Sequence, residues 1–274
     1  MALISKKQVE KFQETIWDFY AKEKRSMPWR NTSDGYAILV SEIMLQQTQV
    51  ERVRVKYEEF LRAFSTFEAL ATAPLSAVLL VWQGLGYNRR AKFLKQCAEI
   101  VMTNHNGTLP RTPQELIMLP GIGKGTVGSL LAFVYNRPVA FIETNIRRIF
   151  IHHFFPNHEQ VSDADILPLV EATLDPHNPR EWYYALMDYG TYLVRQVPNP
   201  NRKSKHHIRQ SRFEGSTRQV RGAIMRELTK NPEGLSITQL DMILPCTREQ
   251  ITHALTSLIK DGLLVEKQAK YCIT

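Results

Sequence analysis

The stretch SEIMLQQTQV, residues 41–50, places one carboxylate in an apolar run. On a helix, Glu42 would share a stripe with Ile38 and Leu45, because residues three and four apart lie on one face. Partial burial would raise the pKa of that carboxyl and let it hold a proton near neutral pH, which is the state a general acid needs. An isolated Glu on such a stripe is also compatible with a structural role, as a helix cap or as the partner of an Arg.

Neutral amides follow this acid, with Gln46 and Gln47 before Thr48 and Gln49 after it. Side-chain amides at a helix end can donate to and accept from exposed base edges without repelling phosphates. The amides therefore favour a nucleic acid as the ligand of this stretch.

A second stretch, LPGIGKGTVGSLLAF, has Gly121, Gly123 and Gly125 directly before an apolar helical pattern. Glycines allow positive φ and a close approach of backbone N–H groups to a ligand, and a following helix N-terminus favours an anion. The stretch lacks the Lys-Ser/Thr ending of a nucleotide P-loop, so it predicts a helix–hairpin–helix that holds a DNA phosphate. A glycine-rich link without function is the alternative.

The net charge of +8 is concentrated in one segment. Between Arg195 and Arg226 the chain has nine Lys or Arg residues and one acid, Glu214, whereas the remaining charges cancel. Such a block is typical of a phosphate-binding surface or of a solvated linker. There is no apolar run of bilayer-spanning length and no signal-peptide pattern, so we expect a cytoplasmic, nucleoid-associated protein that binds no membrane.

We expect helices to position these residues throughout the first 195 residues. Apolar residues repeat there every three or four positions, and the alternation with period 2 that is typical of strands is absent. The predicted helices cover about 8–21, 36–47, 50–63, 74–82, 89–104, 113–119, 126–135, 144–154, 163–174 and 180–195. A basic segment rich in Pro, Asn and Ser follows, over 197–216, and suits a connection along the surface.

Beyond residue 216 the pattern predicts helices near 218–229, 236–243 and 247–260, and then two short strand-like runs around a polar turn. Three helices and a hairpin are typical of a winged helix-turn-helix, whose third helix would enter a DNA groove. A small domain that packs on the core or binds protein is the alternative for 217–274.

Five motifs occur in an order and at a spacing that resemble the adenine DNA glycosylase (MutY) branch of the helix–hairpin–helix glycosylases. They are PWR at 28–30, SEIMLQQTQV at 41–50, WQGLGYNRRA at 82–91, LPGIGKGT at 119–126 and ALMDYG at 185–190. The resemblance covers roughly residues 8–195. It implies an all-α, two-lobed fold over 1–196, with a lobe of about 31–136 inserted between the N-terminal helix and the helices of 137–196, followed by the winged-helix-like module.

The resemblance also implies an activity: the enzyme flips adenine, mispaired with 8-oxoguanine or guanine, out of the duplex and cuts its bond to the sugar. Glu42 then protonates the adenine ring at N7, and Arg30 contacts the flipped base. The side chains that enter or contact the DNA around the lesion are expected to be Gln47, Thr48, Leu85 and Tyr87, with Gly121, Gly123, Lys124, Gly125 and Arg148 as further DNA contacts. Without the resemblance, Leu85 and Tyr87 would be interpreted as core residues.

Cleavage of an N-glycosidic bond develops positive charge on the sugar, so a second carboxylate is expected near it. The family has an aspartate where this chain has Glu143, and Asn145 matches the family and could orient that carboxylate. The added methylene of Glu143 requires the backbone or the sugar to lie about one bond length further away. The alternative is that Glu143 only caps the helix that begins near Thr144 or pairs with Arg147.

Two further positions depart from the family. Gly125 stands where the family has a tyrosine, or a nucleophilic lysine in lyase members, and Lys124 would be turned away by roughly 100° on a helix. We therefore predict a monofunctional glycosylase. Tyr184 stands where a Glu or Gln usually contacts the adenine edge, and it could stack on the flipped base.

The family's four iron–sulfur cysteines, expected after MDYG, are missing. The chain has three cysteines, Cys97, Cys246 and Cys272, and their wide spacing is typical of cysteines that only pack in a core. We therefore predict neither the cluster nor another metal site. We expect the basic segment, with Arg202, Lys203 and Lys205, to present cations to DNA phosphates in place of the cluster loop.

The expected partner is therefore double-stranded DNA with a mispair or an oxidised guanine, bound by a monomer without a cofactor. Two alternatives remain: a glycosylase for thymine or uracil opposite guanine, and a catalytically silent protein that senses DNA damage.

Overall fold

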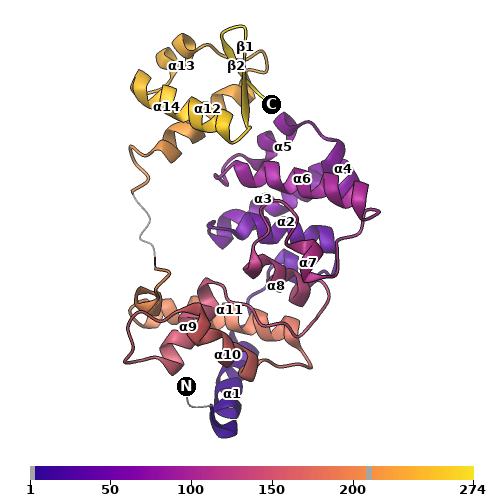
Figure 1. The fold of residues 1–274 in the computed structure, drawn as a ribbon, viewed down its shortest axis with the longest axis vertical. Helices are drawn as coiled ribbons and strands as arrows, with labels where there is room; N and C mark the ends of the chain where they lie inside the picture. Colours follow the sequence, from indigo (N-terminus) through magenta and orange to yellow (C-terminus); the bar gives the residue numbers. More distant parts are fainter. Residues whose placement is uncertain (1–3, 208–211) are drawn as a thin grey trace. The chain divides into compact units, whose positions relative to one another are not determined.

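The computed structural model describes residues 4–207 and 212–274 (Figure 1). Two compact units share the chain. The first comprises Met1–Ile38, Arg111–Met118 and Ile122–Arg209, and the second comprises Leu39–Pro110, Leu119–Gly121 and Gln210–Thr274. The second unit thus includes most of the predicted lobe of 31–136, without its last helices, together with the C-terminal module.

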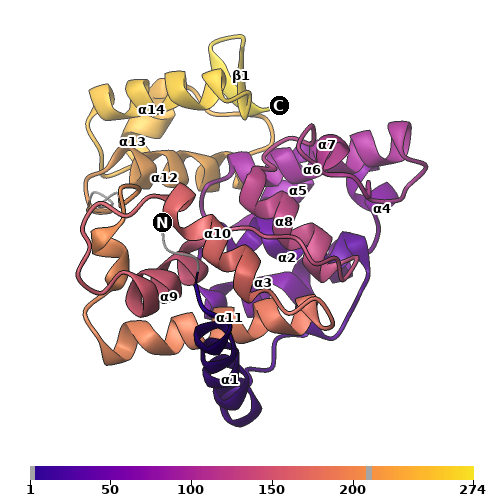
Figure 2. The same ribbon diagram turned by 60° about the horizontal axis from the view of Figure 1, so that its bottom comes forward.

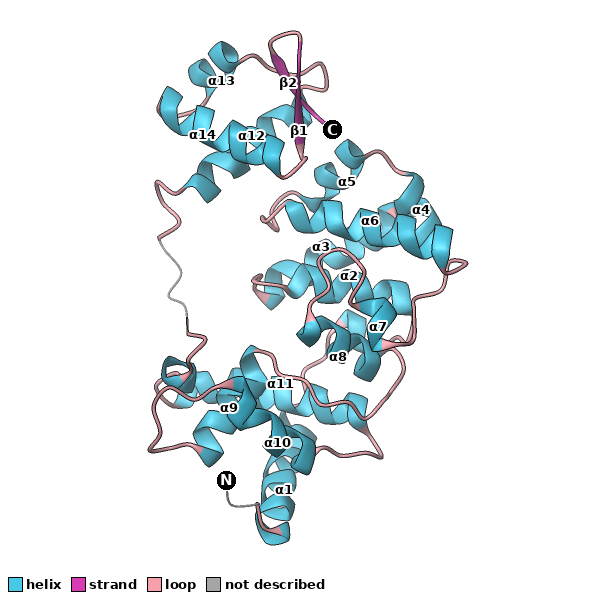
Figure 3. Ribbon diagram, in the orientation of Figure 1, coloured by secondary structure: helices cyan, strands magenta, loops and turns pink. Residues whose placement is uncertain are grey.

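Helices make up most of both units, and the described residues form one two-stranded sheet (Figure 3). The first unit has α1 (Lys6–Glu23), η1 (Pro28–Arg30), α7 (Pro113–Leu116), α8 (Lys124–Phe133), α9 (Thr144–Phe154), α10 (Asp163–Thr173), α11 (Pro179–Gln196) and η2 (Pro200–Lys203). The second has α3 (Val50–Ala63), α4 (Phe67–Thr72), α5 (Leu75–Trp82), α6 (Arg89–Asn104), α12 (Thr217–Lys230), α13 (Ile237–Ile243), α14 (Arg248–Lys260), β1 (Leu264–Lys267) and β2 (Lys270–Ile273). Helix α2 (Gly35–Leu45) begins in the first unit and ends in the second.

Helix α11 is the centre of the first unit, where it packs against α1, α8 and α9 (Figure 2). Large aromatic side chains fill this core: the ring of Phe12 lies 5.2 Å from that of Phe150 and 6.1 Å from that of Trp182. Edge-to-face and tilted contacts of this kind stabilise a core beyond the area that they bury. Helix α1 starts at a capping box in which Ser5 and Gln8 satisfy each other's backbone N–H groups.

In the second unit, α4 and α5 pack against α6, and α3 packs against α5. The amphipathic α3 buries Val53, Tyr57 and Phe60, and the Phe60 ring lies edge-on to the fully buried Trp82 at 5.9 Å. This core fixes the loop after α5, which carries two of the candidate DNA-contacting residues, Leu85 and Tyr87.

The C-terminal module has the order helix, bridge, helix, helix, hairpin. An isolated antiparallel bridge joins Leu235 to Tyr271, so the chain before α13 pairs with β2 at one position. Gln268 and Ala269 form the two-residue turn of the hairpin, both with positive φ, as a type I′ turn requires. This is a winged-helix topology. Its first helix begins at Thr217 behind the cap Ser216.

Among the α-helices, the observed elements differ most from the predicted ones in two places. Helix α4 was not predicted, because six residues hold too few periods to be detected. Helix α7 ends at Leu116 rather than near 119, since the chain turns there into the glycine hairpin. Of the helices that the structure describes, none is both long enough and apolar enough to cross a bilayer.

Candidate active site and DNA-contacting elements

Glu42 lies on α2 with a half-buried side chain, between neighbours that solvent hardly reaches. Leu39, Ile43 and Met44 are each at most 1% exposed. The α2 sequence, GYAILVSEIML, is apolar around nearly the whole helix, so Glu42 is its sole ionisable carboxylate. A carboxyl in this position meets the requirement for a general acid that is partly shielded from water.

Arg90, on α6, holds the end of α2 in place. Its Nη1 donates to the carbonyl oxygens of Ile43 and Met44, both at 2.9 Å, and to that of Gln46. These carbonyls belong to the last turn of α2 and to the residue just beyond it. No backbone N–H group of the helix donates to them, so they need another donor. Burial lowers the pKa of Arg90 to about 10, so the guanidinium remains charged at neutral pH.

The same guanidinium also binds the loop after α5. Its Nη2 donates to Thr48 Oγ1 at 2.9 Å and to the carbonyl oxygens of Leu85 and Gly86 at 3.2 and 3.3 Å. One buried side chain therefore connects the QQTQ turn to the GLGY loop, the two segments expected to enter DNA. Arg90 stands in the motif WQGLGYNRRA, but the sequence alone did not indicate this role for it.

Gln47 and Tyr87 both have left-handed backbone, with φ of 54° and 48°. Non-glycine residues avoid this region unless the surrounding structure imposes it, and such positions cluster at functional sites. Gln47 is exposed and Tyr87 is 38% exposed. Leu85, in contrast, is 2% exposed, which fits the core role that the sequence left open for it and does not favour insertion into DNA.

The glycine hairpin leads from α7 to α8. Gly121 has a φ of +76°, and a Cβ there would lie 2.8 Å from the Phe93 ring, so only glycine fits. Gly123 is the N-cap of α8 and brings no capping side chain. Gly123 and Lys124 are exposed, so the first amide N–H groups of α8 and one ammonium group are open to an anion.

Glu143 is the N-cap of α9. Its Oε1 accepts hydrogen bonds from the backbone N–H groups of Asn145 and Ile146 at 2.7 and 2.8 Å, and its Oε2 accepts one from Asn145 Nδ2 at 3.3 Å. The capping role that the sequence left open is therefore present. It uses one carboxyl oxygen for the helix and leaves Oε2 with a single weak donor, so capping does not preclude a second role.

Burial raises the pKa of the Glu143 carboxyl above its ordinary value, while the N–H donors of Asn145 and Ile146 and the charges of Arg148 and Arg147 oppose the rise. Arg147 does not bind Glu143. It forms a pair of hydrogen bonds with Asp163 on α10 instead, at 2.7 and 2.8 Å.

Gly125 lies in the first turn of α8, beside the segment that leads to Glu143. A Cβ at position 125 would lie 3.3 Å from the carbonyl oxygen of Ile142, a contact that needs a shift of a few tenths of an ångström. A side chain at 125 would thus project next to the Glu143 segment, whereas the side chain of Lys124 is exposed.

Arg30 is bound to Asp188 on α11, a residue that sequence analysis did not single out. Its Nη1 and Nη2 donate to the two carboxylate oxygens, each at 2.8 Å. The Nε of Arg30 is buried and has no hydrogen-bond partner among the described residues. A pocket beside this guanidinium is lined by Lys24, Arg25, Ser26, Met27, Arg30 and Asn31.

Tyr184 is 3% exposed and in contact with two other side chains. Its ring stacks on Phe133 at 4.6 Å and 14°, and the Arg30 guanidinium lies 4.5 Å from its centroid. With a ring on one face and a cation over the ring, Tyr184 has no open face on which a base could stack. This geometry makes Tyr184 a support for Arg30.

The cationic residues expected to contact DNA fall into two groups. Arg202, Lys203 and Lys205 are exposed or half-buried, and Lys203 Nζ donates to the carbonyl oxygen of Pro156 at 2.5 Å. Arg148 is only 8% exposed, and its donors face inward, which favours a role within the protein.

The three cysteines belong to distant segments of the chain. The segment after α11 has none, Cys97 is buried in α6, and Cys246 and Cys272 belong to the C-terminal module. Within residues 4–207 and 212–274, no group of three or more His, Cys, Asp and Glu side chains could hold a metal ion.

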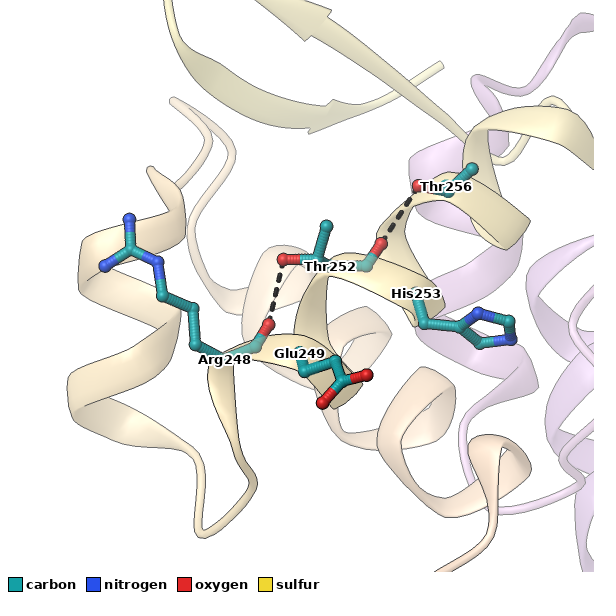
Figure 4. Close-up of a pocket in the computed structure, with 5 residues that line it drawn as sticks. All are labelled: Arg248, Glu249, Thr252, His253 and Thr256. Atoms are coloured by element: carbon teal, nitrogen blue, oxygen red, sulfur yellow. Dashed lines mark hydrogen bonds between the residues drawn. The ribbon is translucent and has the colours of Figure 1, made fainter.

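Helix α14 carries a shallow concavity that is distant in sequence from the residues above. Figure 4 shows the residues that line it, Arg248, Glu249, Thr252, His253 and Thr256. The two threonine hydroxyls donate to carbonyl oxygens of their own helix, at 2.8 and 3.0 Å, whereas Arg248, Glu249 and His253 extend away from the helix. Both signs of charge are present, so the concavity lacks the uniform positive charge of a phosphate site.

Comparison with known proteins identifies the family. The family model of the HhH-GPD superfamily base excision DNA repair proteins matches residues 40–166. An adenine DNA glycosylase of Mycolicibacterium smegmatis is 32% identical over 266 residues, which cover 91% of each chain. The chain belongs to the adenine DNA glycosylase branch of this superfamily. It is therefore a DNA glycosylase of base excision repair.

Similarity to another glycosylase class is also present. A thymine/uracil-DNA glycosylase of Methanothermobacter thermautotrophicus is 28% identical over 185 residues, 66% of this chain and 84% of that one. The solved structure of a thermostable thymine-DNA glycosylase aligns with a TM-score of 0.63 and 28% identity, over 73% of this glycosylase and 91% of that chain.

Proposed function

We propose that this glycosylase removes adenine mispaired with 8-oxoguanine or guanine and that it has no strand-cleaving activity. The observation that carries the proposal is Glu42, a half-buried carboxyl on the apolar helix α2, in a chain that is similar to an adenine DNA glycosylase over nearly its whole length. A carboxyl held in apolar surroundings can donate a proton to a leaving purine at neutral pH.

In the proposed reaction, Glu42 protonates N7 of the flipped adenine, and the bond between the sugar and the base breaks with its electron pair going to the base. Positive charge develops on the sugar, where the carboxylate of Glu143 stabilises it. Water then adds to the sugar carbon, loses a proton and leaves an abasic site. Gly125 offers no amine that could attack the sugar, so the reaction ends there.

Three features support the proposed contacts with the substrate. The Nε of Arg30 is a buried donor without a hydrogen-bond partner among the described residues, and it lies beside the pocket in which we propose that the flipped base binds. Gln47 and Tyr87 are held in strained, accessible positions from which side chains can enter the base stack. The exposed amide N–H groups at the start of α8 suit a backbone phosphate. We propose that the protein acts as a monomer in the nucleoid.

The test is single-turnover base release from duplexes that carry A opposite 8-oxoguanine, A:G, A:C, T:G or U:G, with and without alkali. Wild type should release adenine, with strand breaks only after alkali. Glu42→Gln should abolish release while its affinity for the same duplex stays within about threefold of wild type. Strand breaks without alkali would contradict the monofunctional mechanism.

A second candidate is removal of thymine or uracil opposite guanine. The covered ring of Tyr184, in place of a polar side chain that could read adenine, favours it, as does the similarity to the thymine/uracil-DNA glycosylase. Release from T:G or U:G alone would establish this activity. Tight binding without release from any duplex would instead indicate the silent damage sensor.

A further inference from the structure

Arg148 is a buried guanidinium whose position depends on three different segments of the first unit. Its Nη1 donates to Asn145 Oδ1 on its own helix and to the carbonyl oxygen of Gly190 on α11, both at 2.7 Å. Its Nε donates to Asn199 Oδ1 at 3.3 Å. A buried Arg with this many acceptors has one orientation open to it, because any rotation would leave donors unpaired.

The contact with Arg148 decides which way the amide of Asn145 points. A guanidinium can only donate, so the atom that faces it must be the amide oxygen. The amide nitrogen then faces the other way, toward Oε2 of Glu143 at 3.3 Å. Arg148 thus fixes a donor beside the carboxyl oxygen that the helix cap leaves almost unused.

Asn199 belongs to the segment after α11, where this chain departs from the cysteine pattern of its family. The segment is bound to α9 at two points: Asn199 accepts from Arg148, and Asn201 Nδ2 donates to the carbonyl oxygen of Thr144 at 3.0 Å. Backbone hydrogen bonds between Val161 and the neighbours of Ser204, at 2.8 and 2.9 Å, hold its other end. The position of Asn199 is therefore defined independently of Arg148.

Gly190 completes the arrangement. A Cβ there would lie 2.7 Å from the Cβ of Asn145, so α11 and α9 approach each other closely at this point. This approach brings the Gly190 carbonyl to Arg148.

We propose that Arg148, held by Asn199, is a positioning residue that orients Asn145 and, through it, the Oε2 atom of Glu143 for the sugar. The inference deepens the proposed function, since it rests on a role for Glu143 in that reaction. The segment after α11 thereby gains a task in the reaction that is separate from binding phosphates.

Three substitutions of Asn199 separate this role from a purely structural one. Asn199 also caps η2, because its Oδ1 accepts from the Asn201 N–H at 3.2 Å. Asn199→Asp keeps the acceptor for both partners. Asn199→Ser keeps a hydroxyl that can cap η2 but is one bond too short for Arg148. Asn199→Ala removes both contacts, and thermal unfolding of each variant reports whether the fold is intact.

The first readout is the rate of single-turnover base release as a function of pH. We expect Asn199→Ala and Asn199→Ser to lose about tenfold, and Asn199→Asp to stay within about twofold of wild type. The acidic limb should move to higher pH in the two slow variants, because a loosened Arg148 no longer opposes the burial that raises the pKa of Glu143. The other charges near Glu143, Arg147 and its partner Asp163, are unchanged in all three.

The second readout does not require activity. Carbon-13 NMR titration of the Glu143 carboxyl, assigned with Glu143→Gln, should give a higher pKa in Asn199→Ala and Asn199→Ser than in wild type. A normal rate in Asn199→Ser, or slow variants whose acidic limb and Glu143 pKa are unchanged, would overturn the positioning role. If wild type released no base from any duplex, the proposed function would fail, and the NMR titration would still decide the positioning role.

Discussion

The guanidinium of Arg30 and the carboxylate of Asp188 form a buried ion pair with two parallel hydrogen bonds of 2.8 Å. The two side chains are 6% and 1% exposed. Arg25 joins the pair through its backbone N–H at 3.0 Å and its Nε at 2.6 Å. Two segments that are more than 150 residues apart in sequence, the PWR motif and the MDYG motif, are thus joined within the first unit by charge.

Asp188→Asn should therefore destabilise the protein strongly. The change leaves the Arg30 charge buried without a counter-ion, and loss of one partner of a buried pair costs about 3–5 kcal/mol. The measurement is the free energy of unfolding in urea at pH 7. Asp163→Asn is the matched control, because Asp163 also accepts two hydrogen bonds from one guanidinium, that of Arg147, but is 37% exposed, and the change should cost less than about 1 kcal/mol. Equal losses in both variants would contradict this account.

The same pair predicts how stability depends on pH. Burial alone would raise the pKa of Asp188, but the hydrogen bonds and charges of Arg30 and Arg25 outweigh it and hold that pKa below its ordinary value. A depressed carboxyl pKa stabilises the fold above the ordinary value of 3.8, and this contribution is lost as the pH falls through the folded-state pKa. Unfolding free energies of wild type and Asp188→Asn should therefore converge below about pH 4. A constant difference down to pH 2 would show that the charge of Asp188 is not what stabilises the fold.

The left-handed backbone at Gln47 should separate stability from function. Residues with a side chain disfavour left-handed backbone, and Gln47→Gly removes this strain. The free energy of unfolding should therefore stay within about 1 kcal/mol of wild type or rise. Base release should fall about tenfold if the side chain supports the extruded base. Gln160, with a φ of 58°, is the matched control, because Gln160→Gly changes the same backbone type away from the candidate site. Full activity of Gln47→Gly would exclude the proposed contact.

Arg90→Lys tests the connection between the QQTQ turn and the GLGY loop. A lysine ammonium cannot reach acceptors in both segments, so several buried carbonyls lose their donor at a cost of about 2–3 kcal/mol. Affinity for a mismatched duplex should fall as well, because both segments become mobile. Arg89→Lys is the control, since Arg89 is 57% exposed and its nearest contact with Asp261 is 3.6 Å. Hydrogen exchange of residues 46–48 and 84–88 should quicken in Arg90→Lys and stay unchanged in the control.

Periodicity predicted the helices well because most of them are amphipathic and end at recognisable caps. The predicted spans 50–63, 89–104 and 144–154 coincide with α3, α6 and α9. The six-residue α4 was missed, since it spans fewer than two turns. The winged topology was predicted from the order of three helices and a hairpin, but the bridge of Leu235 to β2 is a tertiary contact and leaves no local signal.

The candidate site was predictable where a residue type is out of place in its local pattern. Glu42 is an acid in an apolar helix, and Asp188 has the same signal in α11, where it could have been recognised. The roles of Arg90 and Arg148 could not be predicted, because they depend on carbonyl oxygens that folding brings together. Tyr184 was expected to face the base, and its packing between Phe133 and Arg30 depends on three separate segments.

Gly125→Lys should convert the glycosylase into an enzyme that also attacks the sugar with an amine. Position 125 projects toward the segment of Glu143, and the required Cβ lies 3.3 Å from the Ile142 carbonyl, so the new side chain fits after a small shift. Glycine is a poor helix former, so replacing it in α8 should stabilise the helix by up to about 1 kcal/mol. This gain offsets the close contact of the new Cβ with the Ile142 carbonyl. Borohydride should then trap a covalent complex between Gly125→Lys and a duplex from which the base is released. Gly125→Gln, similar in size but without an amine, should form none. A trapped complex that is lost when Lys124→Gln is added to Gly125→Lys would assign the nucleophile to Lys124 and contradict the predicted orientation of position 125.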